Sequence, residues 1–385
     1  MKPIIKWPGG KSSEIKNIKD LIPSFDRYIE PFFGGGALFF YLKPQNAIIN
    51  DISNTLIDFY KLVKVQDENL HELLLDYYGS FQSLLATCNK YKKEILNVYQ
   101  KACLPLSTKE IVISEVKKLV KFMQSEIILD FNKKLVLNVN EFLNFIISNL
   151  ADKIIRTVKL NEKRKLSMPD LIDNLYTGFT SGYYMYFRKV YNDINLNRLN
   201  NVSLEYKVAN FYFIREYCYG SMFRYNKQGE FNIPYGGISY NKKVFKHKID
   251  NIFNQDIENL FANTKIKCMD FEKLLMNVNL NERDFIFLDP PYDTDFSDYE
   301  NRAFSKYDQQ RLADILKNIK AKFILVIKNT DFIASLYKQN FNIISFDNKY
   351  TYNVRGRNER KVEHLIITNF TINNDINLYN QLYIK

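Results

Sequence analysis

The clearest pattern in the chain is a set of short apolar runs that end abruptly at polar or turn-forming residues. The run Phe285–Leu288 stops at Asp289, and Pro290 and Pro291 follow. Four consecutive apolar residues are typical of a strand buried on both faces, and proline offers no N–H to continue a ladder. We therefore expect Asp289 at the carboxyl end of a central parallel strand, where open α/β sheets form their ligand crevice. The alternative is a strand that ends at proline beside a solvated aspartate.

Two similar runs lie near the N-terminus. A short strand is predicted at 28–30, followed by the glycine turn 34–36 and a helix, and a second strand is predicted at 47–50, ending at Asp51. In doubly wound folds, a glycine turn after the first strand lies against the cofactor, and an acid at the next strand tip holds ribose hydroxyls. Asp51 could equally cap a helix that begins at Ile52.

The chain opens with a tight turn, in which Trp7, Pro8 and two glycines precede Lys11. Glycine lets the backbone approach a ligand closely, Lys11 could meet a carboxylate, and Trp7 could cover an apolar or cationic part of the ligand. A helix capped by Ser12 or Ser13 is expected next. The competing interpretation is an ordinary turn with a core tryptophan.

Further runs continue the alternation of strands and helices. Strands are predicted at 265–269, 323–327, 341–346 and 362–368, and helices at 272–276 and 308–317. Between residues 80 and 180 the apolar spacing is helical, with lysines on the opposite face, which predicts an enlarged helical module. The polar stretch 224–236 suits a β-hairpin that presents bidentate groups to base edges, or a surface hairpin with no such role.

Composition narrows the class of protein. The 385 residues include 54 Lys and Arg against 43 Asp and Glu, a net charge of +11, with 27 tyrosines and 30 phenylalanines. This excess favours a polyanionic partner with stacking surfaces, although an AT-rich genome would inflate the same residue types. Four scattered cysteines and three scattered histidines predict neither a disulfide framework nor a metal site. We expect a cytoplasmic protein without a membrane segment.

Together these motifs resemble the Dam-type family of DNA adenine-N6 methyltransferases with alpha-group motif order. The resemblance includes the lysine-tryptophan opening, Glu30-Pro31-Phe32-Phe33 with its glycines, Asn50-Asp51, and Asp289-Pro290-Pro291-Tyr292. The segment 222–236 resembles the family's Arg-x-Asn…Gly-x-Phe-Asn-x-Pro segment, and 183–188 resembles its aromatic-plus-arginine helix. Residues 1–80 and 180–370 carry the likeness, and Pro8 departs from the alanine of many members.

The resemblance implies an α/β fold: a Rossmann-like S-adenosylmethionine-dependent methyltransferase sheet with an inserted, mostly helical DNA-recognition domain carrying a β-hairpin. The catalytic domain would comprise 1–75 and 255–385, and the target-recognition domain 76–254. The implied reaction transfers a methyl group from S-adenosyl-L-methionine to N6 of an adenine flipped out of double-stranded DNA.

The resemblance also implies a role for each matching residue. The catalytic set comprises Asp289, Pro290, Pro291 and Tyr292. The cofactor would contact Trp7, Pro8, Lys11, Glu30, Phe32, Gly34, Gly36, Asp51, Asp270, Phe271 and Asp289. DNA would contact Arg188, Arg224, Asn226, Lys227, Asn232, Arg355 and Arg357. No metal is implied. For Asp270 a plain helix N-cap is the competing interpretation.

Several alternatives remain open at this point. Cytosine N4 methylation uses similar chemistry, although serine is then commoner at the position of Asp289. RNA or a protein amide could be the substrate, and a DNA-binding protein could keep the scaffold without catalysis. We expect a monomer in a restriction-modification system, with a cognate restriction endonuclease acting separately, or a phage or orphan methylase. GATC is the leading expectation for the target.

Overall fold

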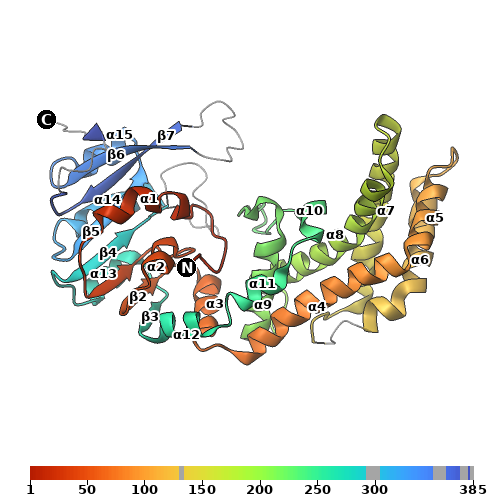
Figure 1. Cartoon of the computed structure of the whole chain (residues 1–385), viewed down its shortest axis with the longest axis horizontal. Coiled ribbons are helices and arrows are strands. Elements are labelled where there is room, and N and C mark those ends of the chain that lie inside the picture. The colour runs from red at the N-terminus through yellow and green to blue at the C-terminus, as the bar shows by residue number, and fades with distance from the viewer. Residues whose placement is uncertain (130–133, 292–303, 350–360, 373–379, 382–385) are drawn as a thin grey trace. The chain divides into compact units, whose positions relative to one another are not determined.

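The structure is a computed structural model, and it describes residues 1–129, 134–291, 304–349, 361–372 and 380–381. The chain folds into two compact units, the first made of 1–65 with 255–385 and the second of 66–254 (Figure 1). The sequence placed the first boundary after residue 75, which falls inside helix α4 (Glu68–Lys90). The N-cap of α4 is Asp67, which accepts a hydrogen bond from the Leu70 N–H.

The first unit alternates strands with short helices. Its elements are η1 (Lys11–Ser13), α1 (Ile15–Ile18), η2 (Lys19–Leu21), β1 (Arg27–Glu30), α2 (Ala37–Leu42), β2 (Ala47–Asn50), α3 (Asn54–Lys64), α12 (Gln255–Ala262), β3 (Thr264–Lys267), α13 (Phe271–Asn277), β4 (Asp284–Leu288), α14 (Lys306–Leu316), β5 (Lys322–Lys328), α15 (Asp331–Tyr337), β6 (Asn342–Lys349), β7 (Lys361–Thr368) and β8 (Asn380–Gln381). Every strand predicted from the apolar runs is present.

The strands form one sheet in the order β3-β2-β1-β4-β5-β7-β6-β8. Five neighbouring strands pair in parallel, in the order β3, β2, β1, β4 and β5. Strand β7 pairs antiparallel with both β5 and β6. The order reverses between β1 and β4, so the carboxyl ends of these two strands flank the switch point of the sheet. The predicted α/β class with a mainly parallel sheet is confirmed.

Helices cover both faces of this sheet (Figure 1). On one face, Ile29, Ile286 and Leu325 join a core cluster with apolar residues of α13, α14 and α15. On the other face, Tyr28 packs against Phe39 of α2, with ring centroids 6.3 Å apart. Because successive side chains of a strand point to opposite faces, strands buried on both sides need the continuous apolar runs seen in the sequence.

Two capping expectations are corrected by the structure. Neither Ser12 nor Ser13 caps a helix, because both lie inside the short 3-10 turn η1, and Glu14 occupies the N-cap position of α1. Asp51 does not cap α3 either, because Ser53 accepts the hydrogen bond from the Leu56 N–H. Asp51 therefore keeps its carboxylate for other contacts.

The second unit is almost entirely helical among its described residues. Its elements are α4, α5 (Lys92–Ala102), α6 (Lys109–Leu129), α7 (Val139–Lys163), α8 (Met168–Asn195), α9 (Leu204–Tyr217), η3 (Tyr219–Ser221), α10 (Ile238–Asn241) and α11 (Phe245–Asp250). The predicted apolar face of α6 is buried at Val112, Val116 and Met123. Where a β-hairpin was expected, the chain forms two isolated antiparallel bridges, Cys218 with Tyr235 and Tyr225 with Phe231.

Helices α7 and α8 approach closely because α8 carries Gly178 and Gly182 at the contact. A Cβ added at Gly182 would lie 2.6 Å from the Ile146 Cα. We expect Gly182→Ala to lower the free energy of unfolding of this unit by about 1–3 kcal/mol, because backbone rather than a flexible side chain must move. Equilibrium urea denaturation measures this change. Gly79→Ala in α4, where an added Cβ meets nothing within 4 Å, should be neutral or stabilising.

Candidate active site

A cavity of about 320 Å³ lies at the carboxyl ends of β1, β2 and β4. This volume is at the lower end of the range of ligand pockets. All the residues that the resemblance assigned to the cofactor line it: Trp7, Pro8, Lys11, Glu30, Phe32, Gly34, Gly36, Asp51, Asp270, Phe271 and Asp289. The structure therefore brings together five sequence segments that are up to 282 positions apart, from Trp7 to Asp289.

Asp289 lies at the end of β4 and pairs with Lys11, whose Nζ is 2.9 Å from Asp289 Oδ1. The Lys11 side chain is 3% exposed and the Asp289 side chain 19% exposed. Burial raises the pKa of Asp289 to about 6, and the neighbouring Lys11 limits that rise. The carboxylate is thus ionised near neutral pH but stays close to its titration range. It can accept hydrogen bonds and can also take up a proton.

Glu30, at the end of β1, is the second buried acid of the cavity. It accepts a hydrogen bond of 2.8 Å from the Tyr28 hydroxyl. Burial raises its pKa well above the ordinary value, and the negative charges of Asp289 and Asp51 raise it further. The described lining holds one lysine and five acids, Glu30, Asp51, Asp270, Asp289 and Asp308, and so favours a ligand that carries positive charge.

Asp51 follows β2 and holds the glycine turn. Its Oδ2 accepts the Gly34 N–H at 2.8 Å and its Oδ1 accepts the Ser53 N–H at 2.9 Å. Burial raises its pKa, and these backbone hydrogen bonds limit the rise. Each carboxylate oxygen has a second lone pair, so Asp51 can still accept hydrogen bonds from ligand hydroxyls.

The glycine turn leaves no room for side chains. Gly34 has φ of +47°, and an added Cβ would lie 2.7 Å from the Trp7 Cδ1. Gly36 has φ of +64°, and an added Cβ would lie 2.4 Å from the Phe33 ring. The turn therefore places Trp7 and bare backbone against the cavity, as only glycine permits.

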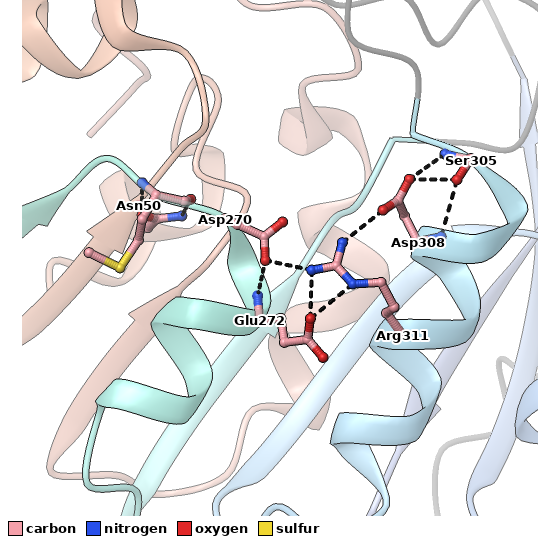
Figure 2. A network of polar contacts seen from close by, with 7 residues as sticks. Asn50, Asp270, Glu272, Ser305, Asp308 and Arg311 are labelled. Carbon is pink, nitrogen blue, oxygen red and sulfur yellow. Dashed lines mark hydrogen bonds and ion pairs between the residues drawn. The ribbon is translucent and has the colours of Figure 1, made fainter.

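Asn50, which the sequence analysis did not assign to the site, connects the segments that follow three strands. Figure 2 shows it beside the segment that leads to Asp270. Its Nδ2 donates to the carbonyls of Pro31 and Met269, both at 2.9 Å, and its Oδ1 accepts the Met269 N–H at 3.0 Å. A polar residue that ends an otherwise apolar strand was the available signal. Asn50 fixes the ends of β1, β2 and β3 against each other.

One wall of the cavity is aromatic, and Arg311 contacts it. Phe32 packs against the rings of Phe271 and Phe304, with centroids 5.3 and 5.6 Å away. Arg311 contacts Asp270 at 2.8 Å and also binds Glu272 and Asp308, as Figure 2 shows. Its guanidinium lies 4.9 Å from the Phe271 ring centroid.

Asp270 has two structural roles at this wall. Its Oδ1 accepts the Glu272 N–H at 3.0 Å, so it caps α13, and the same atom accepts from Arg311. The N-cap alternative is therefore correct for Asp270, and the residue lines the cavity as well.

The turn after Asp289 is held from α14. Pro290 and Pro291 line the cavity, and Gln309 Nε2 donates to the Pro291 carbonyl at 2.9 Å. Gln309 is fully buried and was not singled out from the sequence. Tyr292 lies outside the described residues, as do Arg355 and Arg357.

In the polar segment 224–236 of the second unit, several side chains form hydrogen bonds within the segment itself. Arg224 Nε donates to Asn232 Oδ1 at 2.9 Å. Asn226 Oδ1 accepts the N–H groups of Gln228 and Glu230. Arg224 and Lys227 are exposed, whereas Asn226 and Asn232 are half-buried.

Arg188, on α8, supports this segment from beneath. Its Nη1 donates to the Ile233 carbonyl at 3.2 Å, and the Tyr184 hydroxyl donates to the same carbonyl at 2.9 Å. Asn192, one turn further along α8, both donates to the Phe231 carbonyl and accepts its N–H. The helix thus fixes the backbone of the segment.

None of the described groups of His, Cys, Asp and Glu is arranged to hold a metal ion. Among the helices that the structure describes, none has the length and apolar character required to cross a membrane.

The sheet order, the glycine turn and the acidic cavity at the switch point define a Rossmann-like α/β protein with a cofactor-type pocket. The family model described as D12 class N6 adenine-specific DNA methyltransferase matches residues 7–142 and 111–352. The chain therefore belongs to this family of adenine-specific DNA methyltransferases. The predicted family, that of adenine-specific DNA methyltransferases, and the predicted α/β fold class are confirmed.

Similar proteins span almost the whole chain. Type II methyltransferase M.CviBI from a Paramecium bursaria Chlorella virus is 26% identical over 376 residues, 96% of this chain and 100% of that protein. Type II methyltransferase M.MjaIII from Methanocaldococcus jannaschii is 27% identical over 390 aligned positions, covering 96% and 99%. A DNA adenine methylase from Vibrio cholerae is 20% identical over 376 residues, covering 95% of each chain.

Proposed function

We propose that this enzyme transfers a methyl group from S-adenosyl-L-methionine to N6 of an adenine flipped out of double-stranded DNA, as a site-specific adenine methyltransferase. The observation that carries the proposal is the Asp289 carboxylate, held by Lys11 at the cavity end of β4 and followed by the rigid Pro290-Pro291 turn. A planar base with an exocyclic amino group matches this arrangement of acceptors.

The residues of the cavity fit S-adenosylmethionine. Asp51 offers acceptors for ribose hydroxyls, Phe32 and Phe271 offer an apolar wall for an adenine ring, and the carboxylates complement a cation. When bound, the cofactor supplies an electrophilic methyl group on a positively charged sulfur. The proposed binding set is completed by other residues of the cavity lining: Trp7, Pro8, Lys11, Glu30, Gly34, Gly36 and Asp270.

The chain's own groups would act on the target amine. The Asp289 carboxylate and the Pro290 carbonyl accept hydrogen bonds from the N6 amino group and orient its lone pair. Nitrogen gains a bond to carbon in the reaction, so it must lose one proton to give the neutral product. Asp289, whose pKa is about 6, can accept that proton. Tyr292 would stack on the base, as the family resemblance implies.

We assign catalysis to the first unit and target recognition to the second. The exposed Arg224 and Lys227 lie on a segment that Arg188 and its neighbours on α8 hold rigidly. Such a platform suits contacts to base edges and phosphates, with Asn226 and Asn232 shaping it. Arg355 and Arg357 would add phosphate contacts in the first unit. The type II names of two relatives support a role in restriction-modification. The proposed enzyme is a monomer that acts separately from its endonuclease.

The test is methyl transfer from labelled S-adenosylmethionine to unmodified AT-rich genomic DNA, followed by single-molecule sequencing. Modified adenines confined to one motif are expected, and that motif gives the target sequence. Modified cytosines would overturn the base assignment. Cofactor binding without transfer to DNA would contradict DNA as the substrate, and RNA and protein substrates would then be assayed.

Arg311 should matter for cofactor affinity rather than for chemistry. Arg311→Ala is expected to raise KM for S-adenosylmethionine about three- to tenfold while kcat changes less than twofold. Three partly exposed ion pairs contribute about 1 kcal/mol together, and without them Asp270 and Phe271 lose their brace. Steady-state kinetics at saturating DNA measures the split between KM and kcat.

Arg27→Ala is the matched control for Arg311→Ala. Arg27 binds Asp284 through two atoms at the opposite end of the sheet from the cavity. An equal rise in KM for this control would show that general loss of stability, rather than the cavity wall, explains the effect.

A further inference from the structure

A row of four ionisable side chains, two acids alternating with a lysine and a histidine, runs from the cavity into the core of the first unit. Asp289 Oδ1 lies 2.9 Å from Lys11 Nζ, and Lys11 Nζ lies 3.9 Å from Glu14 Oε1. Glu14 Oε2 lies 3.0 Å from His364 Nδ1. The four residues come from the end of β4, from η1, from the N-cap of α1 and from β7.

Only the first half of this row faces the cavity. Asp289 and Lys11 line the cavity, whereas Glu14 and His364 are buried behind them, with exposures of 5% and 0%. An acid removed from water in this way is costly unless a cation compensates it. Glu14 has two cationic neighbours in the row, Lys11 on one side and His364, when protonated, on the other. Glu14 therefore competes with Asp289 for Lys11, and His364 is placed to relieve that competition.

We propose that His364 is a positioning residue for catalysis: by engaging Glu14 it leaves Lys11 to Asp289, so the ionisation of the catalytic carboxylate is set from outside the cavity. The inference rests on the proposed function for the role of Asp289. It adds two residues, Glu14 and His364, that no sequence motif singled out. They act on the target base only through Lys11 and Asp289.

The sign of each neighbouring charge determines the direction in which it moves the pKa of Asp289. The negative charge of Glu14 raises the pKa of Asp289, whereas the positive charges of Lys11 and of protonated His364 lower it. The acids Glu30 and Asp51 also face Asp289 across the cavity. Around His364, the register partners on the adjacent strands are Lys328 of β5 and Phe346 of β6, and the Phe346 ring is 5.6 Å away.

The experiment is the pH dependence of kcat for the wild type, Glu14→Gln, His364→Gln and the double variant, at saturating DNA and cofactor. Glu14→Gln removes a negative charge and should move the acid limb of the kcat profile to lower pH. His364→Gln removes the positive charge of the protonated imidazole and should move the acid limb to higher pH. Each shift should be about half a pH unit or more. The double variant should return to within about 0.2 pH unit of the wild type, because the two changes cancel.

A structural role alone would not give opposite shifts. Loss of packing at Glu14 or His364 would lower the melting temperature and the overall rate. It would not shift the acid limbs of the two single variants in opposite directions. Arg27→Gln, a charge change at the far end of β1, is the control and should leave the limb in place. Shifts in the same direction, or none for either single variant, would overturn the proposal.

A second measurement separates this inference from the proposed function. Carbon NMR of the Asp289 carboxyl, assigned by comparison with Asp289→Asn, follows its titration without any substrate. The same opposite shifts are expected there for Glu14→Gln and His364→Gln. A wild type that transfers no methyl group to DNA would refute the proposed function, whereas unshifted Asp289 titrations would refute the charge network.

Discussion

Replacement of Asp289 by Asn is expected to lower kcat for methyl transfer by at least about a thousandfold while cofactor affinity changes little. Asparagine keeps the shape of the side chain but replaces one acceptor oxygen with a donor amide, which opposes the N6 amino group. It also cannot take up the proton that nitrogen must lose. Single-turnover methylation measures the rate, and isothermal titration calorimetry measures cofactor affinity.

The same substitution should make the protein more stable at high pH. The pKa of Asp289 is about 6 in the folded protein, whereas an unfolded chain gives ~3.9. The folded state therefore binds this proton more tightly, so stability falls as the pH rises from about 4 to 6, and the loss is complete above that window. It amounts to about 3 kcal/mol. Asp289→Asn should regain up to this amount at pH 8 and nothing at pH 4, by urea denaturation.

Asp308→Asn, at the same cavity, should change the stability at high pH in the opposite direction. Burial raises the pKa of Asp308, but hydrogen bonds from Ser305 and Arg311 outweigh it and lower the pKa overall. Its ionised form is thus stabilising above the unfolded pKa, and Asp308→Asn should lose stability at pH 8. An Asp289→Asn protein that unfolds more easily at pH 8, or that methylates at the normal rate, would contradict the assignment of Asp289.

The strand ends of the site could be predicted because the signals are local. A buried strand needs a continuous apolar run, and a proline or polar residue ends it within one or two positions, so Asp289 and Asp51 could be placed before the fold was known. The order of the motifs along the chain and their resemblance to the family then placed the glycine turn beside these two acids. These inferences needed only neighbouring residues.

The supporting contacts could not be predicted in the same way, because they join distant parts of the chain. Glu14 and His364 are 350 positions apart, and Asn50 and Met269 are 219 positions apart. An isolated Glu or His in a sequence gives no sign of its partner, and the helix cap was expected at Ser12 or Ser13. Such pairs become visible only when the fold brings their segments together.

The polar segment of the second unit illustrates a different limit. Arg, Asn and Lys in a turn-rich stretch indicate many hydrogen-bonding groups, but not which of them serve the fold. The structure shows Asn226 satisfying two backbone N–H groups and Asn232 accepting from Arg224. Arg224 and Lys227 are the exposed members of the set, so the proposed DNA contacts of this segment rest mainly on them.

Gly34→Ala is expected to weaken the binding of S-adenosylmethionine about ten- to a hundredfold. Alanine in this left-handed conformation costs about 1–2 kcal/mol, and its Cβ would overlap the Trp7 indole, which must move. The turn also carries the N–H that binds Asp51 and the carbonyl that accepts from the Tyr60 hydroxyl. A distorted turn therefore disturbs the indole, the acid and the backbone wall of the cavity together.

Gly10→Ala is the matched control, because Gly10 lines the same cavity with an ordinary φ of −54°, and its added Cβ would meet only the Trp7 carbonyl, at 3.4 Å. Calorimetric affinity within about threefold of the wild type is expected for Gly10→Ala, against the large loss for Gly34→Ala. Equal losses in both variants would mean that any added methyl group blocks the ligand. Unchanged affinity in Gly34→Ala would show that the ligand does not depend on the turn. Only a selective loss at Gly34 supports a cofactor held against this backbone, because the strain at positive φ is what distinguishes the two positions.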